Sequence, residues 1–218
     1  MAENKEILEL SARVCAAALA GGFAGCGAAP RSSFAGVPER VDPERVLAGY
    51  SAVLVLAAPP DLVTSSGPYG PALLDVGLSE ALTSVRALLD AAGYQARPVV
   101  SGAVSLPCAA AAAGLGEVSP VGALVASGYG LSLTLVGMVT DAPLAPVAGL
   151  AGESPASAGE SPASAGSGSV GSVVGPVGVC RDCGRCTQDC PAMLPGSFDL
   201  AWCTGCGVCL SVCPLGLE

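Results

Sequence analysis

Eight cysteines between residue 180 and the end of the chain follow one spacing pattern twice, and this pattern constrains the chain more than any other feature. Each run has three cysteines separated by two-residue gaps, a fourth after a three-residue gap, and then a proline. The two runs consist of Cys180, Cys183, Cys186, Cys190 and Pro191, and of Cys203, Cys206, Cys209, Cys213 and Pro214. A disulfide framework does not require the same spacing twice, so the pattern indicates two equivalent metal–sulfur sites.

The pattern C-x2-C-x2-C-x3-C-P is the one with which bacterial ferredoxins bind [4Fe–4S] clusters. Two-residue gaps let a tight loop wrap three thiolates around one cluster, while the fourth cysteine reaches the other cluster. The sequence therefore predicts two [4Fe–4S] clusters. Their expected ligands are Cys180, Cys183, Cys186 and Cys213 for the first, and Cys190, Cys203, Cys206 and Cys209 for the second. Paired zinc sites are the alternative, but zinc ligands usually come as two separated C-x2-C pairs.

Charge and histidine content exclude several classes of function. The chain has 9 Lys and Arg residues, 18 Asp and Glu residues and no histidine, so its net charge is −9. This charge argues against nucleic acid and anionic membranes as partners and favours docking to a basic redox partner protein. The absence of histidine excludes Ser-His-Asp catalysis and histidine-ligated metals. Because cluster thiolates must stay reduced, we expect a cytoplasmic protein of an anaerobe or microaerophile.

Composition divides the chain into three parts. Residues 1–145 are rich in Ala and Gly and predict an α/β or α+β domain. Residues 146–179 predict a flexible linker of Gly, Ser, Pro and Ala, in which GESPASA occurs at 152–158 and again at 159–165. Residues 180–218 predict a small ferredoxin-like module that takes its order from the clusters.

Hydrophobic periodicity predicts the elements of the first domain. The uncharged stretch 118–140 is long enough to span a membrane, but its Ser, Gly and Pro residues favour a turn and a strand in a soluble domain. Residues 27–51 are expected to form a loop. The expected helices are 4–20, 78–92, 109–113 and 121–126, and the expected strands are 52–58, 94–100 and 131–140.

The first domain resembles a known family in several segments. The stretch CAAAAAGLGEVSPVGALVASGYGLSLTLVGMVTDAPLAP, followed by the double cluster motif, is similar to iron–sulfur epoxyqueuosine reductases and corrinoid reductive dehalogenases, and most of all to their shorter relatives. PERVDPERVLAGYSAVLVLAAPP and AAGYQARPVV fit the same layout. The resemblance implies a cobalamin as a further cofactor, to which the clusters pass electrons, with Gly114, Gly116 and Tyr129 as its contacts.

The chain also departs from that family. SLPC precedes the alanine run where the family often carries basic residues and histidine, and EVSPVG follows GLG where it often carries an aromatic residue and lysine. These departures and the acidic composition argue against a transfer RNA substrate.

Single-electron transfer through two clusters is the function that the sequence predicts. The alternative is a corrinoid-dependent reductase of a small organic substrate, and a purely structural role for the clusters is a third. No catalytic residue is assigned, and the substrate, the redox partner, the cluster potentials and the oligomeric state stay open.

Several further residues have both a functional and a packing interpretation. Gly114 and Gly116 can let a flat cofactor approach the backbone, or they can end a helix and allow close packing. Tyr69 and Tyr129 can face such a cofactor or donate a proton, or they can pack. Asp75 and Asp141 can act as acids or cap. Cys15 and Cys26 are expected to be small buried hydrophobes. Cys108 begins a helical segment, where a thiol can become reactive.

Metal analysis tests the cluster prediction. Anaerobically purified protein should contain about eight iron atoms per chain, because two cubanes hold four each. Elemental analysis measures iron and zinc together. Zinc in place of iron would contradict the prediction.

Overall fold

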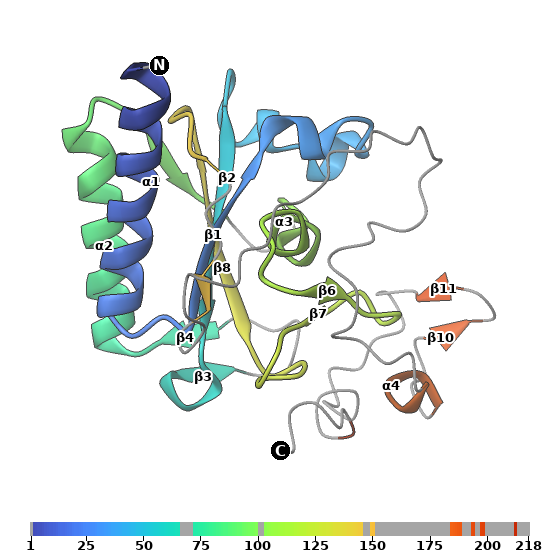
Figure 1. Ribbon diagram of the computed structural model, residues 1–218. Helices are drawn as coiled ribbons and strands as arrows, with labels where there is room; N and C mark the ends of the chain where they lie inside the picture. The colour runs from blue at the N-terminus through green and yellow to red at the C-terminus, as the bar shows by residue number, and fades with distance from the viewer. Residues whose placement is uncertain are drawn as a thin grey trace.

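A computed structural model describes residues 2–65, 72–99, 103–145, 149–150, 184–188, 193–194, 197–198 and 212. Its centre is an antiparallel five-stranded sheet in the order β5-β8-β2-β1-β9. Two long helices cover one face of this sheet, and a short helix with a β-hairpin covers the other (Figure 1). The strands are β1 (Gly25–Pro30), β2 (Ala52–Ala58), β5 (Ala96–Pro98), β8 (Thr134–Thr140) and β9 (Gly149–Leu150).

Strand β2 is the middle of the fold, and all seven of its residues are buried. Alternate side chains of a strand point to opposite faces. Leu54 and Leu56 therefore join the core beneath the two long helices, while Val53 and Val55 join the core on the other face. Burial on both faces explains the uninterrupted apolar run AVLVLAA, and the predicted strand 52–58 is confirmed.

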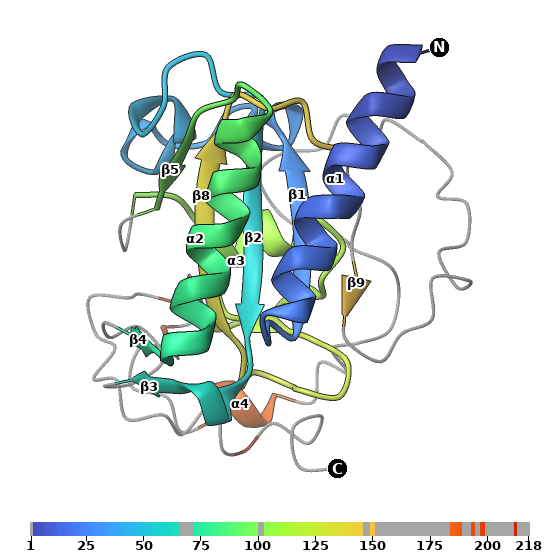
Figure 2. The ribbon, with the colours of Figure 1, turned by 90° about the vertical axis from the view of Figure 1, so that its left-hand side faces the viewer.

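The long helices α1 (Ala2–Ala20) and α2 (Val76–Ala91) lie side by side across one face of the sheet (Figure 2). Both predicted helices are confirmed, within a few residues at their ends. The carboxylate of Asp75 caps α2 by accepting a hydrogen bond of 2.8 Å from the Gly77 N–H. The buried Ser11 hydroxyl ties α1 to the end of the domain, because it accepts a hydrogen bond of 2.9 Å from the Ala145 N–H.

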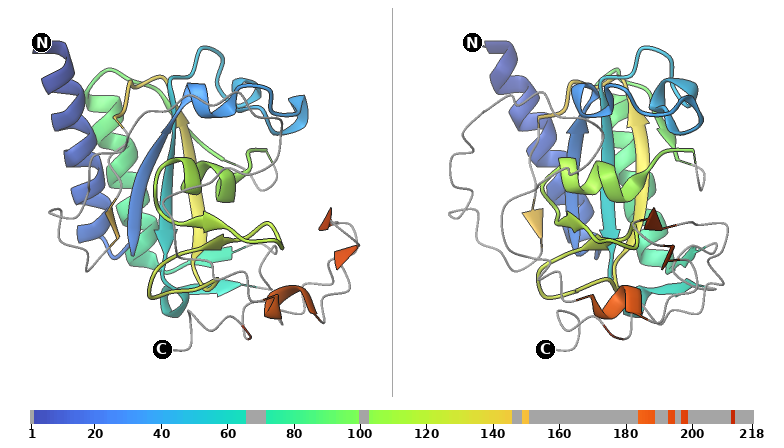
Figure 3. Two further views of the ribbon diagram at one scale, coloured as in Figure 1. Left: turned by 45° about the vertical axis from the view of Figure 1, so that its right-hand side comes forward. Right: turned by 90° about the vertical axis from the view of Figure 1, so that its right-hand side faces the viewer.

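The opposite face is covered by α3 (Leu106–Ala112) and the hairpin of β6 (Glu117–Val118) and β7 (Leu124–Val125), as Figure 3 shows in its right panel. The predicted helix at 121–126 is wrong, because β7 occupies this segment. A turn competes with the helix there: the Gly122 N–H donates to the Ser119 carbonyl at 2.8 Å, and Gly122 has a φ of +76°. Ser-Pro-x-Gly is a turn sequence, and here it overrides the apolar run that follows.

Strand β1 is the other difference from the sequence interpretation, which expected a loop from residue 27 onward. Its residues are small because helices approach it from both sides. A Cβ atom on Gly27 would lie 2.9 Å from the Cβ of Ala113, which follows α3. The sequence GCGAAP, mostly Gly, Ala and Pro, has low strand propensity, so only pairing with β2 and packing against the helices explain this strand.

The remaining elements are short. None of the helices that the structure describes is both long and apolar enough to cross a membrane. The turns of 3-10 helix are η1 (Arg31–Phe34), η2 (Glu39–Val41), η3 (Pro43–Arg45) and η4 (Pro60–Leu62). Outside the main sheet lie β3 (Val63–Ser65) paired with β4 (Ala72–Leu74), α4 (Arg185–Gln188), and β10 (Met193–Leu194) paired with β11 (Ser197–Phe198).

A large-to-small substitution in β2 tests its central role. Leu56→Ala should lower the free energy of unfolding by about 2–5 kcal/mol, because Leu56 is fully buried between α1 and α2 and the sheet. Leu8→Ala on the outer side of α1, where Leu8 is 54% exposed, is the matched control and should cost no more than about 0.5 kcal/mol. Chemical denaturation of the full chain, followed by far-UV circular dichroism, measures both. Equal losses would contradict this account of the core.

Candidate functional site

The cysteine runs lie almost entirely outside the described residues. Cys186 falls within the short helix α4, which follows Gly184. Gly184 has a φ of +71°, and its carbonyl accepts hydrogen bonds from the Thr187 hydroxyl at 2.8 Å and from the Thr187 N–H at 3.1 Å. This tight turn contains Cys186, an expected ligand of the first cluster, where the sequence requires a tight loop. The assignment of the eight ligands stays a prediction.

Gly114 and Gly116 belong to the layer formed by α3 and the hairpin. Gly114 has a φ of +83° and ends α3, with its N–H donating to the Ala111 carbonyl at 3.0 Å. The Leu115 N–H then donates to the Ala110 carbonyl at 2.9 Å, which completes the cap. The predicted end of the helix at Gly114 is confirmed.

Gly116 is buried against the hairpin. A Cβ atom on it would clash with the carbonyl oxygen of Val125 in β7. The missing side chain of Gly116 therefore makes room for the protein's own backbone. A contact between Gly116 and a corrin stays a prediction, but packing already requires glycine at this position.

Tyr129 lies in the turn after β7. Its N–H donates to the Ala126 carbonyl at 3.2 Å, and its half-buried ring packs against the core beside α3. Asp141 accepts a hydrogen bond of 2.8 Å from the Gln95 N–H, so it joins β5 to the end of β8. Both residues thus have structural partners, while Tyr69 lies outside the described residues.

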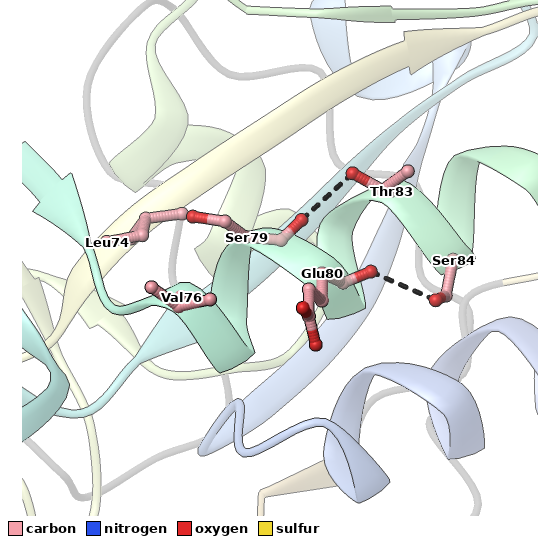
Figure 4. Close-up of a pocket in the computed structure, with 6 residues that line it drawn as sticks. All are labelled: Leu74, Val76, Ser79, Glu80, Thr83 and Ser84. Atoms are coloured by element: carbon pink, nitrogen blue, oxygen red, sulfur yellow. Dashed lines mark hydrogen bonds between the residues drawn. The ribbon is translucent and has the colours of Figure 1, made fainter.

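Two surface hollows are lined by described residues, and neither includes Gly114, Gly116 or Tyr129. The first, of about 560 Å³, lies along α2 (Figure 4). Its lining residues are Leu74, Val76, Ser79, Glu80, Thr83 and Ser84. The hydroxyls of Thr83 and Ser84 donate to the carbonyls of Ser79 and Glu80 in the preceding helical turn. They therefore serve the helix itself and give the hollow little polar specificity.

The second hollow, of about 460 Å³, follows the edge of the sheet at β5. It includes Arg97, together with Arg86, whose guanidinium lies 3.8 Å from the Asp90 carboxylate. This ion pair is exposed, so it contributes little to stability. Neither hollow brings together the residues that the sequence singled out.

The three cysteines outside the two runs have different surroundings. Cys108 is exposed in the first turn of α3, whereas Cys15 and Cys26 are buried, as expected. The sequence interpretation missed that α1 and β1 bring Cys15 and Cys26 together. Their sequence neighbours carry no signal for this pairing, because the strand that holds Cys26 was not expected. Among the described residues, no group of three Cys, Asp or Glu residues is placed to hold a metal ion.

A family model matches part of the C-terminal segment of the chain. Residues 197–216, which contain the second cysteine run, match the family described as a 4Fe-4S binding domain. No curated protein matches the sequence closely enough to count as a relative.

Solved structures share the fold over most of the chain. An epoxyqueuosine reductase matches with a TM-score of 0.64 at 17% identity, over 96% of this chain and 66% of its own. The epoxyqueuosine reductase of Streptococcus thermophilus matches with a TM-score of 0.60 at 17% identity, over 92% of this chain and 64% of its own. The catabolic reductive dehalogenase NpRdhA matches with a TM-score of 0.55 at 18% identity, over 88% of this chain and 30% of its own. The chain thus spans about two thirds of the reductases, and the expected likeness in fold is confirmed.

Two glycines test whether Gly116 is needed for packing. Gly116→Ala should lower the free energy of unfolding by about 3 kcal/mol, because the new methyl group forces the β7 backbone to move. Gly128→Ala is the matched control. Its φ is also positive, at +73°, but its Cβ would meet open space, so we expect a loss of only about 1 kcal/mol. Chemical denaturation without added cofactor measures both, and equal losses would contradict the packing role.

Proposed function

We propose that this chain is an iron–sulfur redox protein that carries two [4Fe–4S] clusters and transfers single electrons. The observation that carries the proposal is the pair of complete cysteine runs. The match of residues 197–216 to a 4Fe-4S binding domain supports the second run directly. The first run repeats the same spacing, so the same chemistry is proposed for it.

The cysteine runs define what the chain's own residues contribute. Eight thiolates hold two clusters, and each cluster supplies one-electron reduction when bound. Cys190 and Cys213, the fourth cysteines of the two runs, each reach across to the other cluster in this pattern. Because each cysteine run supplies one ligand to the other run's cluster, both clusters are bound by the same short segment of the chain. Such close clusters suit an electron relay better than a structural role.

The negative net charge of the chain supports a basic protein as its redox partner. A net charge of −9 favours encounter with a basic surface by electrostatic steering. The same charge repels nucleic acid, so a transfer RNA stem loop is a poor candidate substrate for this chain. We propose cytoplasmic action in an anaerobe or microaerophile, because cluster thiolates need a reducing environment.

The alternative is a corrinoid-dependent reductase of a small organic substrate. It is supported by the fold likeness to epoxyqueuosine reductases and to a reductive dehalogenase. The described residues around GLG add no support, since Gly116 faces the Val125 carbonyl and Tyr129 packs on the core. For this reason electron transfer is the function we favour.

Redox titration tests the proposed electron transfer. The anaerobic protein should take up two electrons per chain, one for each cluster. Cys206→Ser removes an expected ligand of the second cluster and should lower the uptake to about one electron. Cys108→Ser changes an exposed thiol outside both runs and is the matched control, with uptake unchanged.

Cobalt analysis of the same protein preparation separates the two candidate functions. After incubation with cobalamin and gel filtration, an electron carrier should retain no cobalt. One cobalt per chain would favour the corrinoid reductase instead. In the redox titration, an uptake of less than two electrons by the iron-loaded protein would contradict the two-cluster proposal itself.

A further inference from the structure

Cys15 and Cys26 form a buried pair of thiols between α1 and β1. Cys15 lies on the inner side of α1 with Val14 and Ala18, and Cys26 lies in β1 opposite Leu56 of β2. Cys15 is 8% exposed and Cys26 is fully buried. Helix α1 packs directly on β1, and the structure holds both cysteines as thiols. They lie eleven positions apart in the sequence, so tertiary packing has brought them together.

The two thiols are not equivalent. They are within hydrogen-bonding reach, with the Cys26 S–H donating to the Cys15 sulfur. This hydrogen bond lowers the pKa of Cys15, although burial acts in the opposite direction. The hydrogen bond, burial and the nearby charge of Cys15 together raise the pKa of Cys26. Cys15 therefore ionises in preference to Cys26, and it also retains some exposure, so that a small reagent can reach it.

We propose that Cys15 and Cys26 are a modification site at which a hydroperoxide converts the pair to a disulfide while the domain remains folded. Oxidation would join α1 covalently to the central sheet. This inference concerns the first domain and does not depend on the proposed electron transfer by the clusters.

The reaction takes two steps. The Cys15 thiolate attacks one peroxide oxygen, so that an S–O bond forms, the O–O bond breaks, and the proton that Cys15 gave up goes to the departing oxygen. The Cys26 sulfur then attacks the sulfenic acid of Cys15, an S–S bond forms, and water leaves with the Cys26 proton. Two thiols and one hydroperoxide give one disulfide, one alcohol and one water. The sulfurs together lose two electrons, and the peroxide gains them.

A single tryptic peptide reports on this pair. Cleavage after Arg13 and Arg31 releases residues 14–31, which contain Cys15 and Cys26 and no other cysteine. The full-length protein with its clusters is treated anaerobically with one equivalent of hydrogen peroxide, then alkylated, digested and analysed by mass spectrometry. We expect peptide 14–31 to lose two hydrogen atoms and to escape alkylation, while the cluster absorbance persists.

Three variants separate the roles of the cysteines. Cys15→Ser should lower oxidation of the peptide at least about tenfold, because the remaining thiol of Cys26 is fully buried and inaccessible. Cys26→Ser should abolish the disulfide and leave a sulfenic acid on Cys15 that dimedone traps. Cys108→Ser, which removes an exposed thiol, should behave as the unmodified protein does.

The unmodified protein keeps the test decisive even if a variant fails to fold. Three results would overturn the proposal. Peptide 14–31 could remain fully alkylated after the peroxide has been consumed, its cysteines could be linked to other peptides, or its disulfide could form only after the cluster absorbance has been lost.

Discussion

Burial of β2 on both faces is the constraint on which the described structure depends. Its alternating Leu and Val side chains fill one core beneath α1 and α2 and another beneath α3. Because both faces of the strand exclude water, its backbone groups must be paired. Strand β8 pairs with residues 52–58 and strand β1 with residues 52–57. The helices, the hairpin and the neighbouring strands are positioned by this one segment.

Small side chains set the distances within these layers. The chain has only 4% aromatic residues and 30 glycines, so its core is filled more by neighbouring layers packing closely than by large side chains. Gly27 against Ala113, and Gly116 against the Val125 carbonyl, are two places where a larger residue would push layers apart. The same closeness brings the thiols of Cys15 and Cys26 into contact. A glycine in such a chain is therefore as well explained by packing as by the approach of a cofactor.

Sequence periodicity predicted the elements that have strong local patterns. Hydrophobic periodicity predicted strand 52–58 and helices α1 and α2, because the apolar residues of each segment alone show its pattern. Strand β1 and the hairpin could not be predicted in this way. The first is the segment GCGAAP, which forms a strand only because it pairs with β2. In the second, an apolar run favoured a helix that the turn at Ser119 and Gly122 prevents.

The sequence by itself determined the iron–sulfur character of this protein, because ligand spacing along a short segment is a local property. It also determined the acidic charge and the central strand. Only the tertiary structure decided that Gly116 faces β7, that Asp141 accepts a hydrogen bond from Gln95 and that Cys15 lies against Cys26. These contacts depend on how separate segments come together in three dimensions. A pattern along the chain records periodicity and spacing, but it does not record which helix will lie against which strand.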